Sequence, residues 1–105
     1  MEYTFTNENF EQEVLKSKQP VLIDFYADWC GSCRMMGPTV SALAAKYEGK
    51  LKVGRVNVDK QQDLAARYGV MSIPDFVVIK DGEIAGQFIG AMPKDVLESR
   101  LKAIL

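Results

Sequence analysis

Residues 21–33 of this chain read VLIDFYADWCGSC. Residues 21–27 are apolar or aromatic on both alternating faces, with the single exception of Asp24. A strand of this kind is typical of the interior of a parallel sheet, where helices cover both faces. The pair Cys30 and Cys33 follows directly, so we expect it at the carboxyl end of the strand, where open α/β sheets place their functional sites.

Cys30 and Cys33 are the only cysteines of the chain, and their Cys-x-x-Cys spacing suits a small disulfide ring that can open to a dithiol. Helical periodicity begins at this point, and the unpaired N–H groups and dipole of a helix start lower the pKa of a thiol. The alternative is half of a structural zinc site, which needs four Cys or His ligands. The chain has no histidine, so such a site would have to be shared between subunits. We therefore predict a redox pair and no metal site.

Length and composition exclude several classes of protein. The 105 residues predict one domain over 1–105, and a net charge of −1 without a Lys/Arg cluster argues against nucleic-acid or anionic-membrane partners. The start of the chain lacks the basic and apolar regions of a signal peptide, and no apolar run is long enough to span a bilayer. Two cysteines are too few to build a disulfide scaffold. We therefore expect a cytoplasmic protein whose cysteine pair is free to cycle.

Apolar residues at helical spacing predict four helices. We expect a first helix capped by Thr6 or Asn7, a long helix from residue 33 to a stop at Gly49, a short helix ending near residues 68–69, and a closing helix with Pro93 in its first turn. Their apolar positions are Phe10, Val14 and Leu15; Met36, Val40, Leu43, Ala44 and Tyr47; and Val96, Leu97, Leu101 and Ile104. Asp59 with Gln62 resembles a capping box for the short helix, and Pro38 should bend the long one.

Three further strands are expected, and a fourth at residues 3–5 would extend the sheet. Residues 51–58 read as a second buried strand, and residues 76–79 and 84–89 flank an Asp81-Gly82 turn, a strong hairpin signal. Right-handed crossovers and one hairpin then give a mixed β-sheet covered by helices on both faces, an α/β fold.

The chain resembles the thioredoxin family over essentially its full length. The resemblance rests on Asp24-Phe25-Tyr26-Ala27, Trp29-Cys30-Gly31-Ser32-Cys33, Pro38, Val56-Asn57-Val58-Asp59, Ile73-Pro74, Asp81-Gly82 and Gly90-Ala91, in this order and at these separations. A Cys-x-x-Cys pair near a βαβ pattern is itself a signal of this family. The resemblance implies the thioredoxin fold, a central mixed sheet flanked by helices on both faces.

The resemblance also implies a role for each site residue. Cys30 attacks a substrate disulfide, and Cys33 resolves the mixed disulfide. Asp24 is a buried carboxyl that helps the proton of Cys33 to move, although an outward-facing residue on an edge strand is the alternative. Arg55 stands where the family has a lysine, and arginine can balance the charge of Asp24 but cannot relay a proton.

A cis Ile73-Pro74 bond is expected to face the cysteines, with the backbone before it pairing with the substrate chain as an added strand. The expected substrate surface consists of Trp29, Ile73, Pro74, Gly90 and Ala91, for which simple core packing is the alternative. The expected supporting residues are Gly31, which lets the backbone turn tightly, Ser32, and Pro38, which presents the first turn of its helix.

Three positions depart from the family pattern. Ser32 replaces a proline, and its N–H and hydroxyl can approach the Cys30 thiolate, which predicts a less reducing couple. Asp75 replaces a threonine; its carboxylate points either toward Cys30, where it would raise the thiol pKa and disfavour acidic substrates, or to solvent. Tyr26 replaces a frequent tryptophan.

These features predict a thiol–disulfide oxidoreductase that acts mainly as a protein-disulfide reductase. The resemblance implies recharging by an NADPH-dependent thioredoxin reductase, no tightly bound cofactor, disulfide-containing protein substrates and a monomer, with a part in electron transport and redox homeostasis. Two other interpretations stay open at this point. One is a non-catalytic binding module in a larger complex, and the other is an oxidase or isomerase that uses the same residues at a higher potential.

Overall fold

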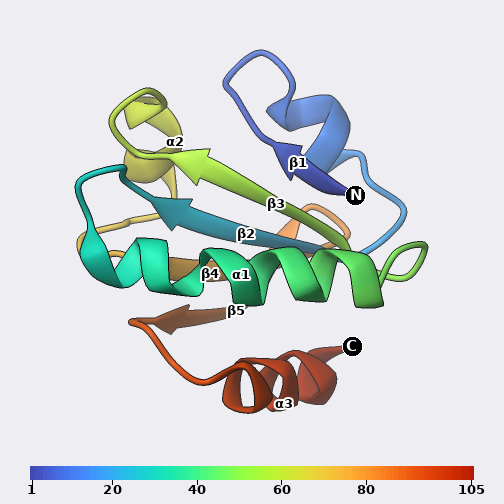
Figure 1. Cartoon of the computed structure of the whole chain (residues 1–105). Helices are drawn as coiled ribbons and strands as arrows, with labels where there is room; N and C mark the ends of the chain where they lie inside the picture. Colours follow the sequence, from blue (N-terminus) through green and yellow to red (C-terminus); the bar gives the residue numbers. More distant parts are fainter.

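The apolar run after Pro20 forms β2 (Val21–Tyr26), the central strand of a five-stranded sheet in the computed structural model of the chain, which describes residues 1–105 (Figure 1). The strand order is β1-β3-β2-β4-β5, with β1 at Glu2–Thr4, β3 at Lys52–Asn57, β4 at Asp75–Lys80 and β5 at Glu83–Ile89. β1 and β2 run parallel to β3, whereas β4 runs antiparallel to both β2 and β5. The predicted mixed sheet is confirmed, including the extra strand near the N-terminus.

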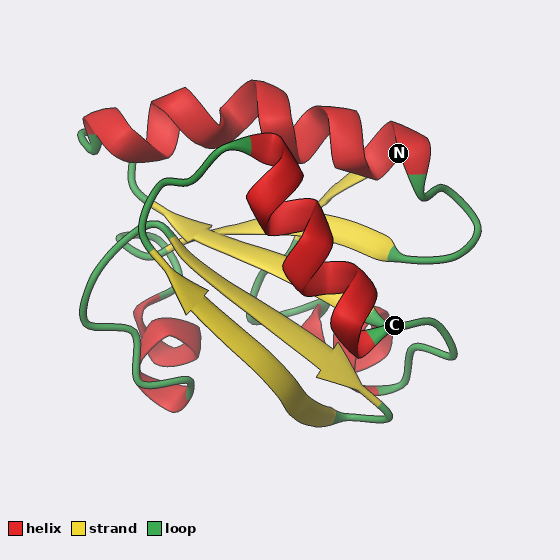
Figure 2. Ribbon diagram, turned by 90° about the horizontal axis from the view of Figure 1, so that it is seen from below, coloured by secondary structure: helices red, strands yellow, loops and turns green.

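Helices cover both faces of this sheet, as predicted. α1 (Gly31–Lys46) and α3 (Lys94–Ile104) lie on the lower face in Figure 1, and Figure 2 shows them crossing over the strands from that side. α2 (Gln62–Arg67) and a short π-helix, η1 (Glu11–Leu15), lie on the upper face. α1 begins at the residue after Cys30, so the chain passes from the central strand through the cysteine pair into the longest helix.

Two apolar cores result from the alternation of side chains along the central strands. On β2, Leu22 faces α1 and α3, whereas Ile23 faces α2 and η1. The core under α1 and α3 contains Leu22, Met36, Val40, Leu43, Ala44, Leu51, Val53, Phe76, Val78, Leu97 and Leu101. The core under α2 and η1 contains Phe5, Phe10, Val14, Val21, Ile23, Phe25, Val56, Leu64, Val77 and Ile79. A strand buried on both sides explains why residues 21–27 are almost uniformly apolar.

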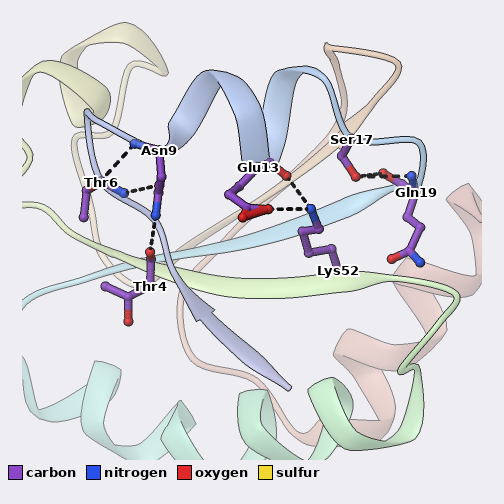
Figure 3. Close-up of polar contacts among 7 residues, drawn as sticks. All are labelled: Thr4, Thr6, Asn9, Glu13, Ser17, Gln19 and Lys52. Carbon is purple, nitrogen blue, oxygen red and sulfur yellow. Dashed lines mark hydrogen bonds and ion pairs between the residues drawn. The ribbon is translucent and has the colours of Figure 1, made fainter.

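The N-terminal segment is held by polar contacts within itself and with β3 (Figure 3). The Thr6 hydroxyl accepts the N–H of Asn9 at 3.3 Å, and the Asn9 side chain accepts the N–H of Thr6 at 2.8 Å. This pair closes the turn before η1, whose own N-cap is Phe10 without a side-chain cap bond, so the predicted cap at Thr6 or Asn7 lies one turn too early. The Lys52 ammonium donates to the carbonyl and the carboxylate of Glu13, at 2.9 and 3.0 Å. The predicted first helix is present with Phe10 and Val14 buried, but its regular part is the five-residue π-helix.

The predicted capping box at Asp59 is wrong. The Asn57 side-chain oxygen accepts the N–H groups of Asp59 and Lys60, and the Gln62 side chain donates to the carbonyl of Asp59 rather than to a cap N–H. The carboxylate of Asp59 instead accepts a hydrogen bond from Trp29. The short helix nevertheless ends as predicted, with Tyr68 as its C-cap.

Two details of α3 also differ from the prediction. Pro93 caps the helix from outside, with an extended ψ of 152°, and does not occupy its first turn. Val96 is 36% exposed, while Leu97 and Leu101 are fully buried. The reason is geometric, because Leu97, Leu101 and Ile104 follow the helical period and Val96 lies about 100° away from Leu97 around the axis. The hairpin turn is as predicted, with positive φ at both Asp81 and Gly82.

Candidate active site

Cys30 and Cys33 form a disulfide, with their Cα atoms 5.2 Å apart. Cys30 is the N-cap residue of α1, and its sulfur accepts the backbone N–H of Cys33 at 3.2 Å. Cys30 is 6% exposed, whereas Cys33 is fully buried, so a substrate can reach only the first sulfur. The N–H of Cys33, which points at the Cys30 sulfur, and the positive end of the helix dipole both favour a thiolate at Cys30.

Ser32 provides a second polar group at the same sulfur. Its hydroxyl oxygen lies 3.3 Å from the Cys30 sulfur, and in the disulfide state only the hydroxyl can donate. A hydrogen bond to a charged thiolate is stronger than one to a neutral disulfide sulfur. The predicted approach of the Ser32 hydroxyl to Cys30 is confirmed, and it is a contact that a proline could not make; its effect on the potential stays a prediction.

The Ile73-Pro74 peptide bond is cis, as predicted. The carbonyl oxygen of Ile73 lies 3.9 Å from the Cys30 sulfur, and Pro74 is buried. The carbonyl of Pro74 accepts the N–H of Gly90 at 2.8 Å, which ties the chain after β5 to the proline loop. The three segments around residues 30, 73 and 90 thus meet at one end of the sheet.

Trp29 is a large apolar surface beside the disulfide. Its side chain is 70% exposed, and its indole N–H donates to Asp59 at 2.9 Å. Simple core packing is therefore excluded for this residue. The hydrogen bond from Trp29 to Asp59 was not predicted from the sequence, because Asp59 lies 30 residues away in the chain and has the pattern of a helix cap.

Three other predicted site residues are Gly31, Pro38 and Ala91. Gly31 begins α1 without a positive φ, and a Cβ there would meet only the Arg34 side chain at 3.9 Å, so neither the backbone conformation nor a close contact requires a glycine at this position. Pro38 lies inside α1, as predicted. The side chains that pack against the cysteines and Ala27 are Tyr26, Val58 and Ile73. Neither Pro38 nor Ala91 is among them, and Ala91 is exposed.

Asp24 is fully buried, which excludes an edge-strand position. It shares a sheet face with Leu22, so it faces the side of α1 and α3. Burial raises the pKa of Asp24 to about 6, against the lowering effect of Arg55, whose Nε donates to one carboxylate oxygen at 2.9 Å. The other oxygen, Oδ1, has no hydrogen-bond partner, and no direct hydrogen bond joins Asp24 to Cys33.

Arg55 links this carboxyl to the ring of Tyr26. Its guanidinium lies 4.0 Å from the ring centroid, a stacking contact that a lysine would make less well. The side chain of Arg55 is 23% exposed, and therefore its charge reaches water while its Nε reaches Asp24. Arg55 and Tyr26 therefore stack on each other beside Asp24, a pairing that neither departure from the family pattern predicts by itself.

Asp75 points neither to solvent nor into a hydrogen bond with Cys30. It is fully buried, and its Oδ2 accepts a hydrogen bond from the side-chain amide of Gln87 at 2.7 Å. Asp75 alternates with Phe76 and shares its face with Val77 and Ile79, on the side of α2 and η1. Burial raises the pKa of Asp75, against the effect of the Gln87 hydrogen bond, and Oδ1 has no partner.

No group of three or more His, Cys, Asp or Glu residues is arranged to hold a metal ion. No helix combines the length and the apolar character that a membrane crossing needs.

Comparison with known proteins gives a consistent result. The family model described as Thioredoxin matches residues 2–103. Similar curated proteins include thioredoxin from Porphyra purpurea, 48% identical over 91% of this chain and 90% of the relative. Thioredoxin 1 from Nostoc sp. is 46% identical over 92% of this chain and 91% of the relative. Thioredoxin from Pseudomonas aeruginosa is 44% identical over 93% and 91%, respectively.

Proposed function

The chain belongs to the thioredoxin family and is a thiol–disulfide oxidoreductase, and from this premise we propose that it acts mainly as a reductase of protein disulfides with Cys30 as its nucleophile. One observation carries the proposal. The only reachable sulfur, that of Cys30, receives the Cys33 N–H and the Ser32 hydroxyl beside the carbonyl of Ile73. The non-catalytic binding module is not favoured, because both cysteines are present and paired.

The reaction uses the dithiol form and needs no other redox group. The Cys30 thiolate attacks one sulfur of a substrate disulfide, the substrate S–S bond breaks, and the departing thiolate takes a proton. Cys33, once deprotonated, attacks the Cys30 sulfur of the mixed disulfide and releases the second substrate thiolate. The substrate gains two electrons, and the protein ends as the Cys30–Cys33 disulfide. Members of the family work without a cofactor.

Asp24 is the proposed acceptor for the Cys33 proton. Its pKa of about 6 makes it largely ionised at neutral pH yet easily protonated, as a general base needs. Its free Oδ1 faces the side of the sheet that carries α1 and Cys33. Because no direct hydrogen bond joins them, the transfer requires one bridging water or a small movement. Arg55 steadies the charge of Asp24 and does not relay the proton.

The proposed substrate surface is formed by Trp29, Ile73, Pro74, Gly90 and Ala91. The exposed Trp29 ring and the carbonyl of Ile73 near Cys30 support it, because an extended substrate segment can then pair with the backbone before Pro74. The family generally works with thioredoxin reductase, and we infer an NADPH-dependent reductase as the electron donor of this chain. We further infer that it works in the cytoplasm, since a reducing compartment suits a dithiol reductant, and as a monomer, since one chain supplies the whole site.

The test is reduction of a protein disulfide with NADPH and a thioredoxin reductase. We expect Cys30→Ser to abolish turnover. We expect Cys33→Ser to accumulate a covalent complex between Cys30 and a substrate cysteine, which intact-mass spectrometry detects. Turnover by the Cys30→Ser variant would contradict the assignment of the nucleophile. So would mixed disulfides that join the wild-type protein to its substrate through Cys33 and never through Cys30.

A further inference from the structure

A groove lies between α1 and the loop that leads into α3. Its volume is about 360 Å³, and its lining residues are Met35, Met36, Thr39, Ala91, Met92 and Pro93. No charged side chain lines it, and it holds three of the five methionines of the chain. We call it the methionine groove. Methionine is flexible and polarisable, so a wall of methionines adapts to apolar side chains of different shape.

The floor of the methionine groove is fixed, while one part of its rim is free. The buried Met36 accepts the N–H of Met92 on its sulfur at 3.5 Å, and the Met92 sulfur accepts from Arg100 at 3.8 Å. The side chain of Met35 makes no hydrogen bond, and Met35 is 74% exposed. An exposed long apolar side chain over a preformed apolar floor can close over a ligand group at little cost in rearrangement.

The methionine groove is continuous with the proposed substrate surface. Ala91 belongs to both, and it follows Gly90, which is bonded to Pro74. On the other wall, Met35 lies one helical turn after Gly31 on the same face of α1, so this wall starts at the disulfide. A substrate chain that pairs beside Pro74 with its cysteine at Cys30 therefore has the groove within reach of its neighbouring side chains.

We propose that the methionine groove binds one apolar side chain of the substrate protein close to the attacked cysteine, and so selects among protein disulfides. This inference rests on the proposed function. The expected side chains are leucine, methionine and phenylalanine, because the groove offers apolar contact without a polar partner. Met35 is then a specificity-determining residue, with no part in the sulfur chemistry.

The experiment measures kcat/KM for a panel of disulfide-bonded peptides and for oxidised glutathione. Each peptide carries serine at all positions near its cysteine except one, which is leucine. We expect one leucine position to raise kcat/KM about tenfold over the all-serine peptide, as burial of an apolar side chain does. Met35→Gln should reduce that preference to less than about threefold, and Met35→Leu should retain it.

The matched control is Met71→Gln, the same change at a methionine that is 95% exposed and outside the groove. It should keep the preference, and all variants should reduce oxidised glutathione at the wild-type rate. Equal rates for all peptides in wild type, or a full preference in Met35→Gln, would overturn the inference. A wild-type protein that reduces neither peptides nor glutathione would overturn the proposed function itself.

Discussion

Two carboxylates, Asp24 and Asp75, are fully buried at the end of the sheet that carries the disulfide, and each has one oxygen without a partner. They lie on adjacent strands but on opposite faces of the sheet, Asp24 toward α1 and α3 and Asp75 toward α2 and η1. Asp24 is paired with the cation Arg55, whereas Asp75 is paired only with the neutral amide of Gln87.

The comparison indicates that burial alone does not suit a carboxyl to the proposed proton transfer. Asp24 shares its face with the helix that carries Cys33, and the positive charge of Arg55 allows it to ionise near neutral pH. Asp75 has neither the cation nor the position beside α1. The proposed proton-accepting role therefore suits Asp24 and not Asp75, whose hydrogen bond with Gln87 joins the start of β4 to β5.

The largest expected effect is on stability. The pKa of Asp24 is raised by folding from 3.8 to about 6, so the folded state holds its proton more tightly than the unfolded state does. Stability from this group is thus present below about pH 4 and is lost as the pH rises through about 6, a change on the order of 2–3 kcal/mol. Asp24→Asn should raise the free energy of unfolding at pH 7 by about 2 kcal/mol and flatten that pH dependence.

Chemical denaturation of wild type and Asp24→Asn from pH 4 to pH 8 measures this effect. Arg55 in the variant keeps partial access to water, which limits the penalty for its lost partner. A variant less stable than wild type at pH 7 would show that the Arg55 pair outweighs the burial of Asp24.

The second prediction concerns the rate. Asp24→Asn should slow resolution of the mixed disulfide about tenfold at pH 7, below the usual range for general base catalysis because the contact with Cys33 is indirect. The wild-type rate should rise with pH through an apparent pKa near 6, and this rise should vanish in the variant. Asp75→Asn, the matched change on the other face, should alter the rate less than twofold. Stopped-flow Trp29 fluorescence follows this step, and equal effects of the two variants would remove the distinction between the faces.

The third prediction concerns the sulfur of Cys30, to which neither Asp24 nor Asp75 is hydrogen-bonded. Ser32→Pro and Ser32→Ala both remove the hydroxyl beside Cys30 and should make the potential about 30 mV more negative, equivalent to roughly 1.4 kcal/mol for two electrons. Serine favours the thiolate and hence the reduced form, so its loss favours the disulfide. Equilibration with a glutathione buffer measures the shift. An unchanged or less negative potential in both variants would sink the role given to Ser32.

The smallest expected effect is at Gln87. Gln87→Leu removes the only hydrogen bond to the Asp75 carboxylate and should destabilise the protein by about 1 kcal/mol at pH 7. In wild type, the hydrogen bond from Gln87 lowers the pKa of Asp75, because it favours the ionised carboxylate. The destabilisation of the Gln87→Leu variant should therefore shrink at acidic pH, where Asp75 is protonated. A double-mutant cycle with Asp75→Asn isolates the pair. No coupling in that cycle would mean that Asp75 does not depend on Gln87.

The sequence predicted what is encoded locally. The continuous apolar run of β2 allowed only a strand buried on both sides, so the burial of Asp24 followed from its neighbours. The Asp81-Gly82 turn and the cysteine spacing are equally local signals.

The contacts that the sequence did not predict at Asp59, Asp75 and Arg55 all join distant residues. Asp59 has the sequence of a helix cap, but its carboxylate binds Trp29, 30 residues earlier. Asp75 follows a proline like a turn residue, and only the β4–β5 pairing brings Gln87 to it. The stacking of Arg55 on Tyr26 likewise depends on the pairing of β2 with β3. No local pattern carries such information.

The most direct test of the central claim is a redox titration of the Cys30–Cys33 pair, followed by the fluorescence of Trp29. The account predicts a single two-electron transition at a potential clearly more negative than about −180 mV, the range of disulfide isomerases. Such a value would identify a reductant of protein disulfides. A potential at or above about −180 mV would contradict the account and make the chain an oxidase or isomerase.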